Sequence, residues 1–286
     1  MEKSKVFFIP TVSSEAVVSL IDLLSGGLTG KIGIKVHSGE QGNQNFISPD
    51  FWAPAIEKIG GTVVECNTAY QGARNTTSAH LRTLNKHGWT RFPLDLMDKD
   101  GEITIPVKNG KHLDKNYVGA TFPEYGSMLV LSHFKGHPMG GFGGALKNIS
   151  IGLASSYGKQ YIHGAGNADA FWSTEQDVFL EAMAESASSV IEALEGRLVY
   201  INVMCNLSVD CDCCAVAADP EMGDIGVLAS LDPVALDQAC VDLVYASKDP
   251  GKVALIRRME EKNGIHILEA AEALGIGSRE YERIDL

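Results

Sequence analysis

SHFKGHPMGGFGGALKNISIGLASSYGKQYIH, residues 132–163, is the segment of this chain that is most informative about its fold class. It begins inside MLVLSHF, residues 128–134, an apolar run typical of a buried β-strand. In α/β proteins, the loops that follow such strands lie at the carboxyl edge of the sheet, where ligands bind. The stretch therefore predicts a binding site at the end of a strand of an α/β protein.

On both sides of this stretch, apolar segments of strand length alternate with longer segments of helical period. The predicted strands are residues 5–10, 31–36, 61–67, 128–134 and 197–204, and the predicted helices are residues 13–24, 48–61, 174–194 and 230–247. Ser13 or Ser14 would cap the first helix, and Asp232 followed by Pro233 would cap the last. This alternation predicts α/β layers with largely parallel sheets.

The chain is long enough for two modest domains. It has 286 residues, of which 45% are hydrophobic and 21% charged, as in ordinary globular proteins. The polar, turn-rich stretch 95–125 is the best candidate for a boundary. We therefore expect an N-terminal α/β domain over residues 1–125. A C-terminal α/β domain over residues 126–286 would carry the glycine/histidine loop and the cysteines.

The negative charge is confined to the second half of the chain. The net charge is −12, yet Lys+Arg and Asp+Glu balance up to residue 125. Between residues 160 and 247 there are 15 acidic residues and one basic residue, Arg197. Such a surface repels phosphate backbones and anionic lipids, so we expect neither nucleic acid nor membrane partners. The sequence shows neither a long apolar run nor a signal peptide, which predicts a cytoplasmic protein.

The glycine-rich stretch predicts an anion site. Six of the 17 residues from Gly136 to Gly152 are glycine, and glycine lets successive backbone amides approach a ligand closely. Imidazole and ammonium groups supply acid/base chemistry near neutral pH. Its spacing matches neither a P-loop nor a dinucleotide fingerprint. The candidate catalytic residues are His133, His137, Lys147 and His163, and the candidate binding residues are Gly143, Gly144 and Lys159.

Two further polar loops follow predicted strands. Residues 34–49 contain His37 and Glu40 just after Lys35, and residues 70–80 contain Arg74. Loops after strands carry function disproportionately, although a solvated polar loop explains these residues equally well. We expect Lys35, His37, Glu40 and Arg74 to contribute to the binding of a ligand or cofactor.

Four of the six cysteines fall within CNLSVDCDCC, residues 205–214. Thiolates close in sequence can reach one soft metal, so Cys205, Cys211, Cys213 and Cys214 are candidate ligands of a metal ion or an iron–sulfur cluster. Their spacing lacks a CxxC pair, and the neighbouring aspartates raise thiol pKa values unless a cation is present. A redox thiol and a purely structural role stay open. Cys66 and Cys240 are expected to be small core residues.

Together these motifs resemble the uncharacterised-domain (DUF) family numbered 362, whose members are often described as iron–sulfur or ferredoxin-like proteins. The motifs are KVHSGEQGN, the GAR turn, the glycine-rich stretch, GKQYIH, VDCDC and DIGVLASLDPVALDQACVDLV, within roughly residues 30 to 250. Many members carry an inserted ferredoxin module with CxxCxxC repeats, which this chain lacks. The CDC pair is present as Cys211 and Cys213.

HPMGGFGGALK followed by YIH is also distantly similar to the nickel-pincer lactate racemase family. That resemblance implies two α/β domains with the site in the cleft between them. It implies an acid/base role for His137, anchoring of a cofactor by Lys147 and nickel ligation by His163. The family's other acid/base histidine falls near Ala73, so two-base racemisation is not implied.

From these features we expect an enzyme that binds a small anionic, carboxylate-type ligand. The enzyme classes that fit these features are a metal-dependent isomerase and an oxidoreductase. A redox partner or a homo-oligomer is also compatible with the sequence. The alternative is a non-catalytic metal or iron–sulfur protein centred on the cysteine run. We also expect the binding loop to be locally cationic within an acidic surround.

Overall fold

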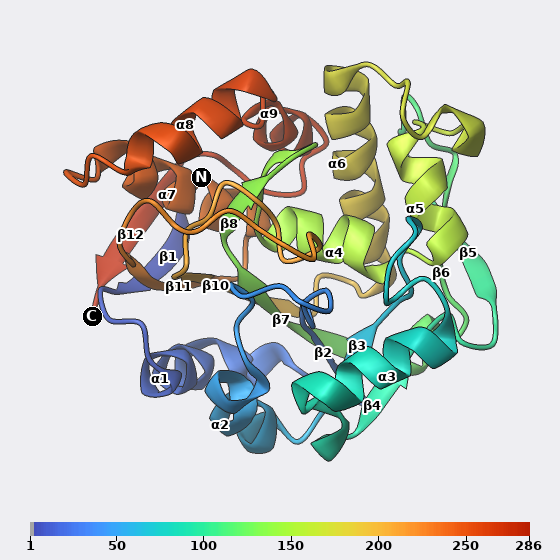
Figure 1. The fold of residues 1–286 in the computed structure, drawn as a ribbon, viewed down its shortest axis with the longest axis horizontal. Helices are drawn as coiled ribbons and strands as arrows, with labels where there is room; N and C mark the ends of the chain where they lie inside the picture. Colours follow the sequence, from blue (N-terminus) through green and yellow to red (C-terminus); the bar gives the residue numbers. More distant parts are fainter. Residues whose placement is uncertain (1–2) are drawn as a thin grey trace.

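One eight-stranded sheet forms the centre of the computed structural model, which describes residues 3–286 (Figure 1). The strands, in their order across the sheet, are β12 (Tyr281–Asp285), β1 (Ser4–Ile9), β11 (Gly226–Ser230), β10 (Leu198–Met204), β7 (Ser127–His133), β2 (Ile32–Lys35), β3 (Thr62–Glu65) and β4 (Leu94–Leu96). Within this sheet, only the pairs β1–β11 and β10–β11 are antiparallel. The expected α/β class with a largely parallel sheet is confirmed.

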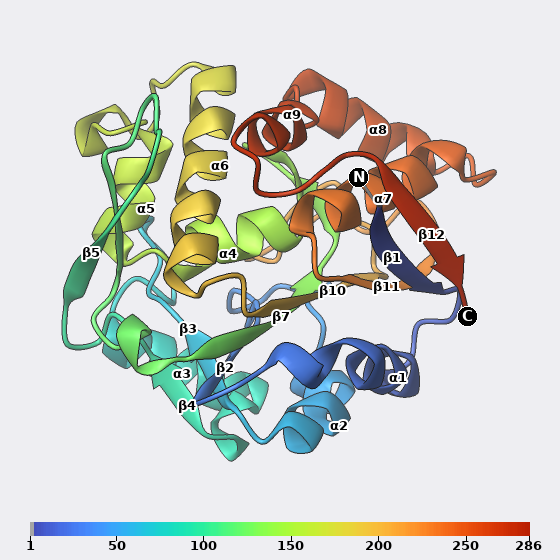
Figure 2. The same cartoon turned by 180° about the vertical axis from the view of Figure 1, so that it is seen from behind.

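Helices cover both faces of this sheet, as Figures 1 and 2 show from opposite sides. One face carries α1 (Ser14–Leu24), α2 (Pro49–Ile59) and α3 (Thr77–His87). The other face carries α4 (Ala145–Leu153), α5 (Ser156–His163), α6 (Gln176–Ala193), α7 (Pro233–Ala246), α8 (Lys252–Glu261) and α9 (His266–Ala273). Alternate residues of β7 point to opposite faces, so Leu129 joins one hydrophobic core and Val130 the other.

The predicted helix ends are confirmed where capping residues mark them. The Ser13 side chain accepts a hydrogen bond from the Ala16 amide at 3.1 Å and begins α1. Gly60 ends α2 in the left-handed conformation, with φ 68°. Asp232 begins α7 by accepting from the Val234 amide at 2.9 Å. Cys66 and Cys240 are buried, as expected of core residues.

The sequence misjudged the stretches of weakest periodicity. Residues 95–125 are not only turns, because β5 (Glu102–Pro106) and β6 (Lys115–Gly119) form a hairpin that packs against α5 and α6. The glycine-rich stretch is not one loop. It contains β8 (Lys135–His137) and β9 (Gly141–Gly143), paired as a hairpin, followed by α4 and α5. Strands β4, β11 and β12 were missed; β4 has only three residues, and β12 is polar.

The predicted boundary near residue 125 lies within a continuous sheet. Strands β1 to β4 come from residues 1–125, and the other four strands come from residues 126–286. Whether the two halves fold separately stays a prediction. Among the described residues, no helix is long and apolar enough to cross a membrane.

The connections place a crevice between β2 and β7. The chain leaves β2 for β3 on one side, whereas it leaves β7 for β10 on the other. The two loops therefore diverge at the carboxyl ends of neighbouring parallel strands, which is where open α/β sheets bind ligands.

Candidate functional site

A pocket of about 280 Å³ lies at this point of divergence. It takes residues from both halves of the chain, and it opens at the carboxyl ends of β2, β3 and β7. Most of the residues singled out in the sequence line it: Lys35, His37, Arg74, His133, His137, Gly143, Gly144, Lys147, Lys159, His163 and Cys213.

Two glycines hold the β8–β9 hairpin and the start of α4 against their neighbours. A Cβ on Gly136 would lie 2.3 Å from the Val209 carbonyl oxygen, so the loop before Cys211 packs directly on the hairpin backbone. A Cβ on Gly144 would lie 2.3 Å from Oδ1 of Asp237. These close approaches require glycine and bring the cysteine loop beside His137.

Asp237 takes the place of a side-chain cap at the start of α4. It is fully buried, and its carboxylate accepts hydrogen bonds from the amides of Ala145, at 2.8 Å, and Leu146, at 3.0 Å. Asn202 donates a third hydrogen bond at 2.7 Å. Burial raises the pKa of Asp237 to about 6. Asp237 therefore fixes the helix turn that presents Lys147 to the pocket.

Two of the pocket cations are neutralised by Glu65 at the end of β3. Lys35 Nζ lies 2.9 Å from Oε2 of Glu65, and Arg74 lies 3.9 Å from its Oε1. Arg74 is also 3.3 Å from Glu40, which lies outside the pocket lining. Burial opposes ionisation of Glu65, but the charges of Lys35 and Arg74 outweigh it and hold its pKa well below the ordinary value. These cations are therefore already paired.

Asp212 neutralises a third cation, Lys135, whose Nζ lies 3.1 Å from Oδ2. The same carboxylate lies 3.0 Å from Nδ1 of His133, and Nε2 of His133 donates to the Cys205 carbonyl at 2.6 Å. Both ring nitrogens of His133 are thus engaged within the protein. His133 has no nitrogen left for a ligand, and its catalytic role stays a prediction.

Lys147 and Lys159 differ from these three cations. Both line the pocket, and neither forms an ion pair with any carboxylate of residues 3–286. Lys159 is buried and donates a hydrogen bond to the Ala154 carbonyl oxygen. Burial lowers the pKa of Lys159. An anion placed near these ammonium groups would supply the missing counter-charge.

His137 is held as a neutral hydrogen-bond donor. Its Nδ1 accepts from the backbone amides of Met139, at 3.1 Å, and Gly140, at 2.8 Å. Burial and the nearby charge of Lys147 lower its pKa to about 4, so the ring is neutral at pH 7. Because Nδ1 carries the lone pair, the proton lies on Nε2.

His163 has the opposite arrangement at the end of α5. Its Nδ1 donates to the Lys159 carbonyl oxygen at 2.7 Å, and burial lowers its pKa to about 3. Phe171 and Phe179 stack on the ring, with centroids 4.5 and 4.7 Å away. The Nε2 lone pair of His163 is therefore unprotonated and available as an acceptor.

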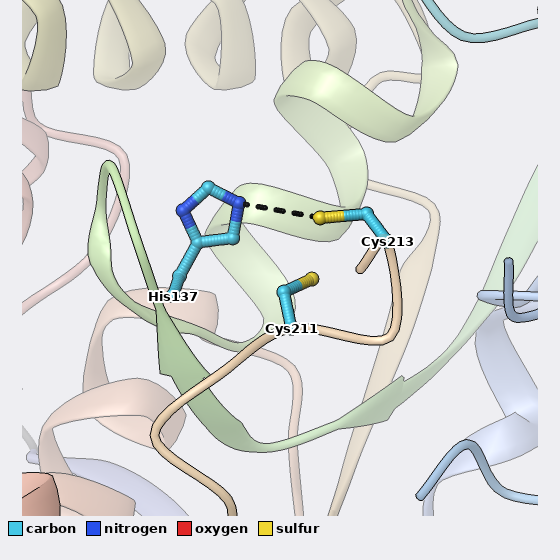
Figure 3. Close-up of side chains that lie close together, drawn as sticks. All are labelled: His137, Cys211 and Cys213. Atoms are coloured by element: carbon cyan, nitrogen blue, oxygen red, sulfur yellow. Dashed lines mark hydrogen bonds between the residues drawn. The ribbon is translucent and has the colours of Figure 1, made fainter. Parts of the chain in front are cut away.

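The side chains of His137, Cys211 and Cys213 lie close together (Figure 3), and His137 and Cys213 line the pocket. Nε2 of His137 and the sulfurs of Cys211 and Cys213 lie within 4.8 Å of one another, and they form the one such group of candidate metal ligands within residues 3–286. Cys205 and Cys214 are not part of it. Burial raises the pKa of Cys205 to about 12, as expected of an inert core thiol.

Sequence reasoning missed three carboxylates that organise the site: Glu65, Asp212 and Asp237. Glu65 lies within the predicted strand 61–67, and a charged residue in an otherwise apolar strand is a signal that could have identified it. Asp212 was judged only as a neighbour of the cysteines. Asp237 lies in the middle of a helix, and the sequence holds no signal of its contact with α4.

Residues 32–242 match the family model described as Domain of unknown function (DUF362). The match covers more than half of the chain. The chain belongs to this family. The DUF362 region contains every residue of the pocket discussed above, together with Asp237 of α7. The family resemblance expected from the motifs is therefore confirmed.

Several solved structures resemble the DUF362 chain, two of which are described here, and no curated protein sequence matches it. The lactate racemase apoprotein from Thermoanaerobacterium thermosaccharolyticum is 14% identical, with a TM-score of 0.47 and coverage of 83% of this chain and 56% of its own. A Thermotoga maritima protein solved by structural genomics is 12% identical, with a TM-score of 0.45 and coverage of 92% and 60%. This chain thus spans less than two thirds of either protein.

Proposed function

We propose that this DUF362 protein binds a small carboxylate-bearing ligand in the pocket between β2 and β7. The observation that supports it is the pair of lysines, Lys147 and Lys159, that line the pocket without a carboxylate partner among residues 3–286. Lys35, Arg74 and Lys135 are balanced by carboxylates of the protein. Lys147 and Lys159 are therefore the pocket cations that a ligand carboxylate would neutralise.

The size and charge of the pocket limit the class of ligand. A volume of about 280 Å³ suits a small metabolite. The second half of the chain is strongly acidic, which disfavours a polyanion as the ligand. A bound carboxylate would raise the pKa of Lys159, because it offsets the burial that lowers it.

The two histidines of opposite tautomer give the ligand an orientation. His137 donates from Nε2, so it favours a ligand oxygen that accepts a hydrogen bond. His163 offers a lone pair, so it favours a ligand group that donates a proton or hydrogen bond. Such an arrangement is suited to an enzyme, because it polarises one side of the ligand and accepts a proton on the other.

The racemase resemblance implies a group anchored at Lys147 and a metal held at His163. His163 fits this role, because metal-binding histidines commonly donate their second nitrogen to a backbone carbonyl, as His163 does to Lys159. Lys147 fits it as a lysine without an ion pair. Such a group would supply electrophilic chemistry beside the ligand.

Thermal unfolding with defined anions tests the binding proposal. We expect millimolar oxalate or malonate to raise the Tm of the wild type, whereas the uncharged amides oxamide and malonamide leave it unchanged. Lys147→Met and Lys159→Met should each weaken the effect at least about tenfold in concentration, the loss of one charge-assisted contact. Lys86→Met, on the exposed face of α3, is the matched control. A wild type that neither carboxylate stabilises would overturn the proposal.

The second hypothesis is a metal or iron–sulfur protein that uses Cys205, Cys211, Cys213 and Cys214. The convergence of Cys211 and Cys213 with His137 supports metal binding by these three side chains. A four-cysteine centre is less favoured, because Cys205 and Cys214 lie outside the group. Stoichiometric iron and sulfide in anaerobically purified protein would establish it.

A further inference from the structure

The cysteine group is better arranged for thiol chemistry than for a metal. A metal at His137 would need the lone pair of Nε2. The amides of Met139 and Gly140 donate to Nδ1, so in the neutral ring Nε2 carries the proton instead. That nitrogen points at the sulfur of Cys213, 3.9 Å away (Figure 3). His137 is therefore a hydrogen-bond donor to sulfur.

The two sulfurs differ in access. Cys213 is partly exposed and lines the pocket, whereas Cys211 is fully buried behind it. Their sulfurs lie within 4.8 Å of each other in a loop held on the backbone of Gly136. A small reagent in the pocket thus meets Cys213 first, and Cys211 is placed to react second.

The acidic neighbours do not repel a thiolate here. Asp212 is paired with Lys135, and Asp210 lies 3.1 Å from Arg258. The carboxylates on either side of Cys211 are therefore neutralised by cations of the protein.

We propose that Cys211 and Cys213 form a redox-active dithiol that reduces small disulfides carrying carboxylate groups. The dithiol chemistry is independent of the proposed function. The preference for carboxylates rests on it, because Lys159 would bind the anionic end of the disulfide.

The reaction balances without a further reactant. Cys213 loses its proton to water and attacks one sulfur of the substrate as the thiolate, which releases one thiolate and leaves a mixed disulfide. That thiolate takes the proton from Cys211, which then attacks Cys213 and releases the second thiolate. The protein loses two electrons to form the Cys211–Cys213 disulfide, and the substrate disulfide gains them as one thiol and one thiolate.

Intact mass after oxidation tests this sequence. The full-length protein is treated with dithiodiglycolate, quenched in acid, unfolded, alkylated with a maleimide and weighed. We expect the wild type to lose two of its six free thiols without an adduct. Cys211→Ser should trap one thioglycolate on Cys213. Cys213→Ser should neither form a disulfide nor carry an adduct. Cys240→Ala, which changes a buried core thiol outside the pocket, is the control and should behave as the wild type. Cys214→Ser tests the neighbouring thiol and should still form the disulfide.

An uncharged disulfide separates the two proposals. Lys159→Met should react about tenfold more slowly with dithiodiglycolate and normally with bis-hydroxyethyl disulfide. If Lys159→Met slowed the reactions with both disulfides equally, or slowed neither, the carboxylate preference would be refuted while the dithiol would stand. Six free thiols in the oxidised wild type, a disulfide that needs Cys214, or thiols protected by a stoichiometric metal would each overturn the dithiol.

Discussion

Replacing Asp237 by asparagine changes a buried carboxylate whose pKa burial raises to about 6, against 3.8 for an ordinary aspartate. The folded state binds this proton more tightly than the unfolded state does. Asp237 therefore contributes stability that is fully present below pH 3.8 and is lost as the pH rises through 6. An amide side chain does not titrate, so the Asp237→Asn variant lacks this dependence.

The magnitude follows from the two pKa values. Between pH 7 and pH 5, protonation of Asp237 stabilises the wild type by about 1.4 kcal/mol, the linkage integral for these values. The variant also loses one acceptor for the Leu146 amide, which costs about 1–3 kcal/mol at every pH. The difference in free energy of unfolding between the two proteins should therefore grow by about 1.4 kcal/mol from pH 7 to pH 5.

Urea unfolding of both proteins at pH 5, 6 and 7 measures this difference. All other titrating groups are shared, so they cancel in the comparison. Ser13→Ala, which removes the side-chain cap of α1, is the control and should show no such growth, because serine does not titrate in this range. A difference that is constant with pH, or that grows toward pH 7, would refute the reasoning about buried charge at the start of α4.

Four other outcomes follow from the structure. Glu65→Gln leaves buried cations without their counter-charge and should destabilise the protein by about 3–5 kcal/mol in urea unfolding; a change under about 1 kcal/mol would contradict the pairing. Gly136→Ala places a Cβ against the Val209 carbonyl oxygen, so it should lower the Tm and slow the reaction of Cys213 with a disulfide. A wild-type Tm and a wild-type rate would show that the hairpin relaxes freely. Glu181 has its pKa lowered to about 2, first by its hydrogen bond to a histidine, so its stabilisation is present above pH 4.5 and is lost as the pH falls toward 2. The advantage of wild type over Glu181→Gln should therefore shrink between pH 5 and pH 3.5, as fluorescence-monitored unfolding would show. Nitrogen-15 NMR at pH 7 should find the proton of His137 on Nε2 and that of His163 on Nδ1, and the reverse assignment would remove the orientation argument.

The local elements of the fold could be predicted because their causes are local. The Ser13 and Asp232 caps, the glycine that ends α2 and the apolar run of β7 each act within a few residues. Strand β12 and the β5–β6 hairpin could not be predicted this way. Strand β12 is held by pairing with β1 from the other end of the chain, and the β5–β6 hairpin is held by packing against α5 and α6.

The sequence also determined which residues gather at the site, because loops after parallel strands meet at one edge of a sheet. It identified the lysines and histidines of the glycine-rich stretch, and it indicated that their surround is acidic. What each does was decided only by tertiary contacts. Glu65 and Asp212 neutralise three of the cations, which leaves Lys147 and Lys159 for a ligand. Whether a histidine donates or accepts depends on the backbone group that faces its other nitrogen, and only the folded chain brings that group into place.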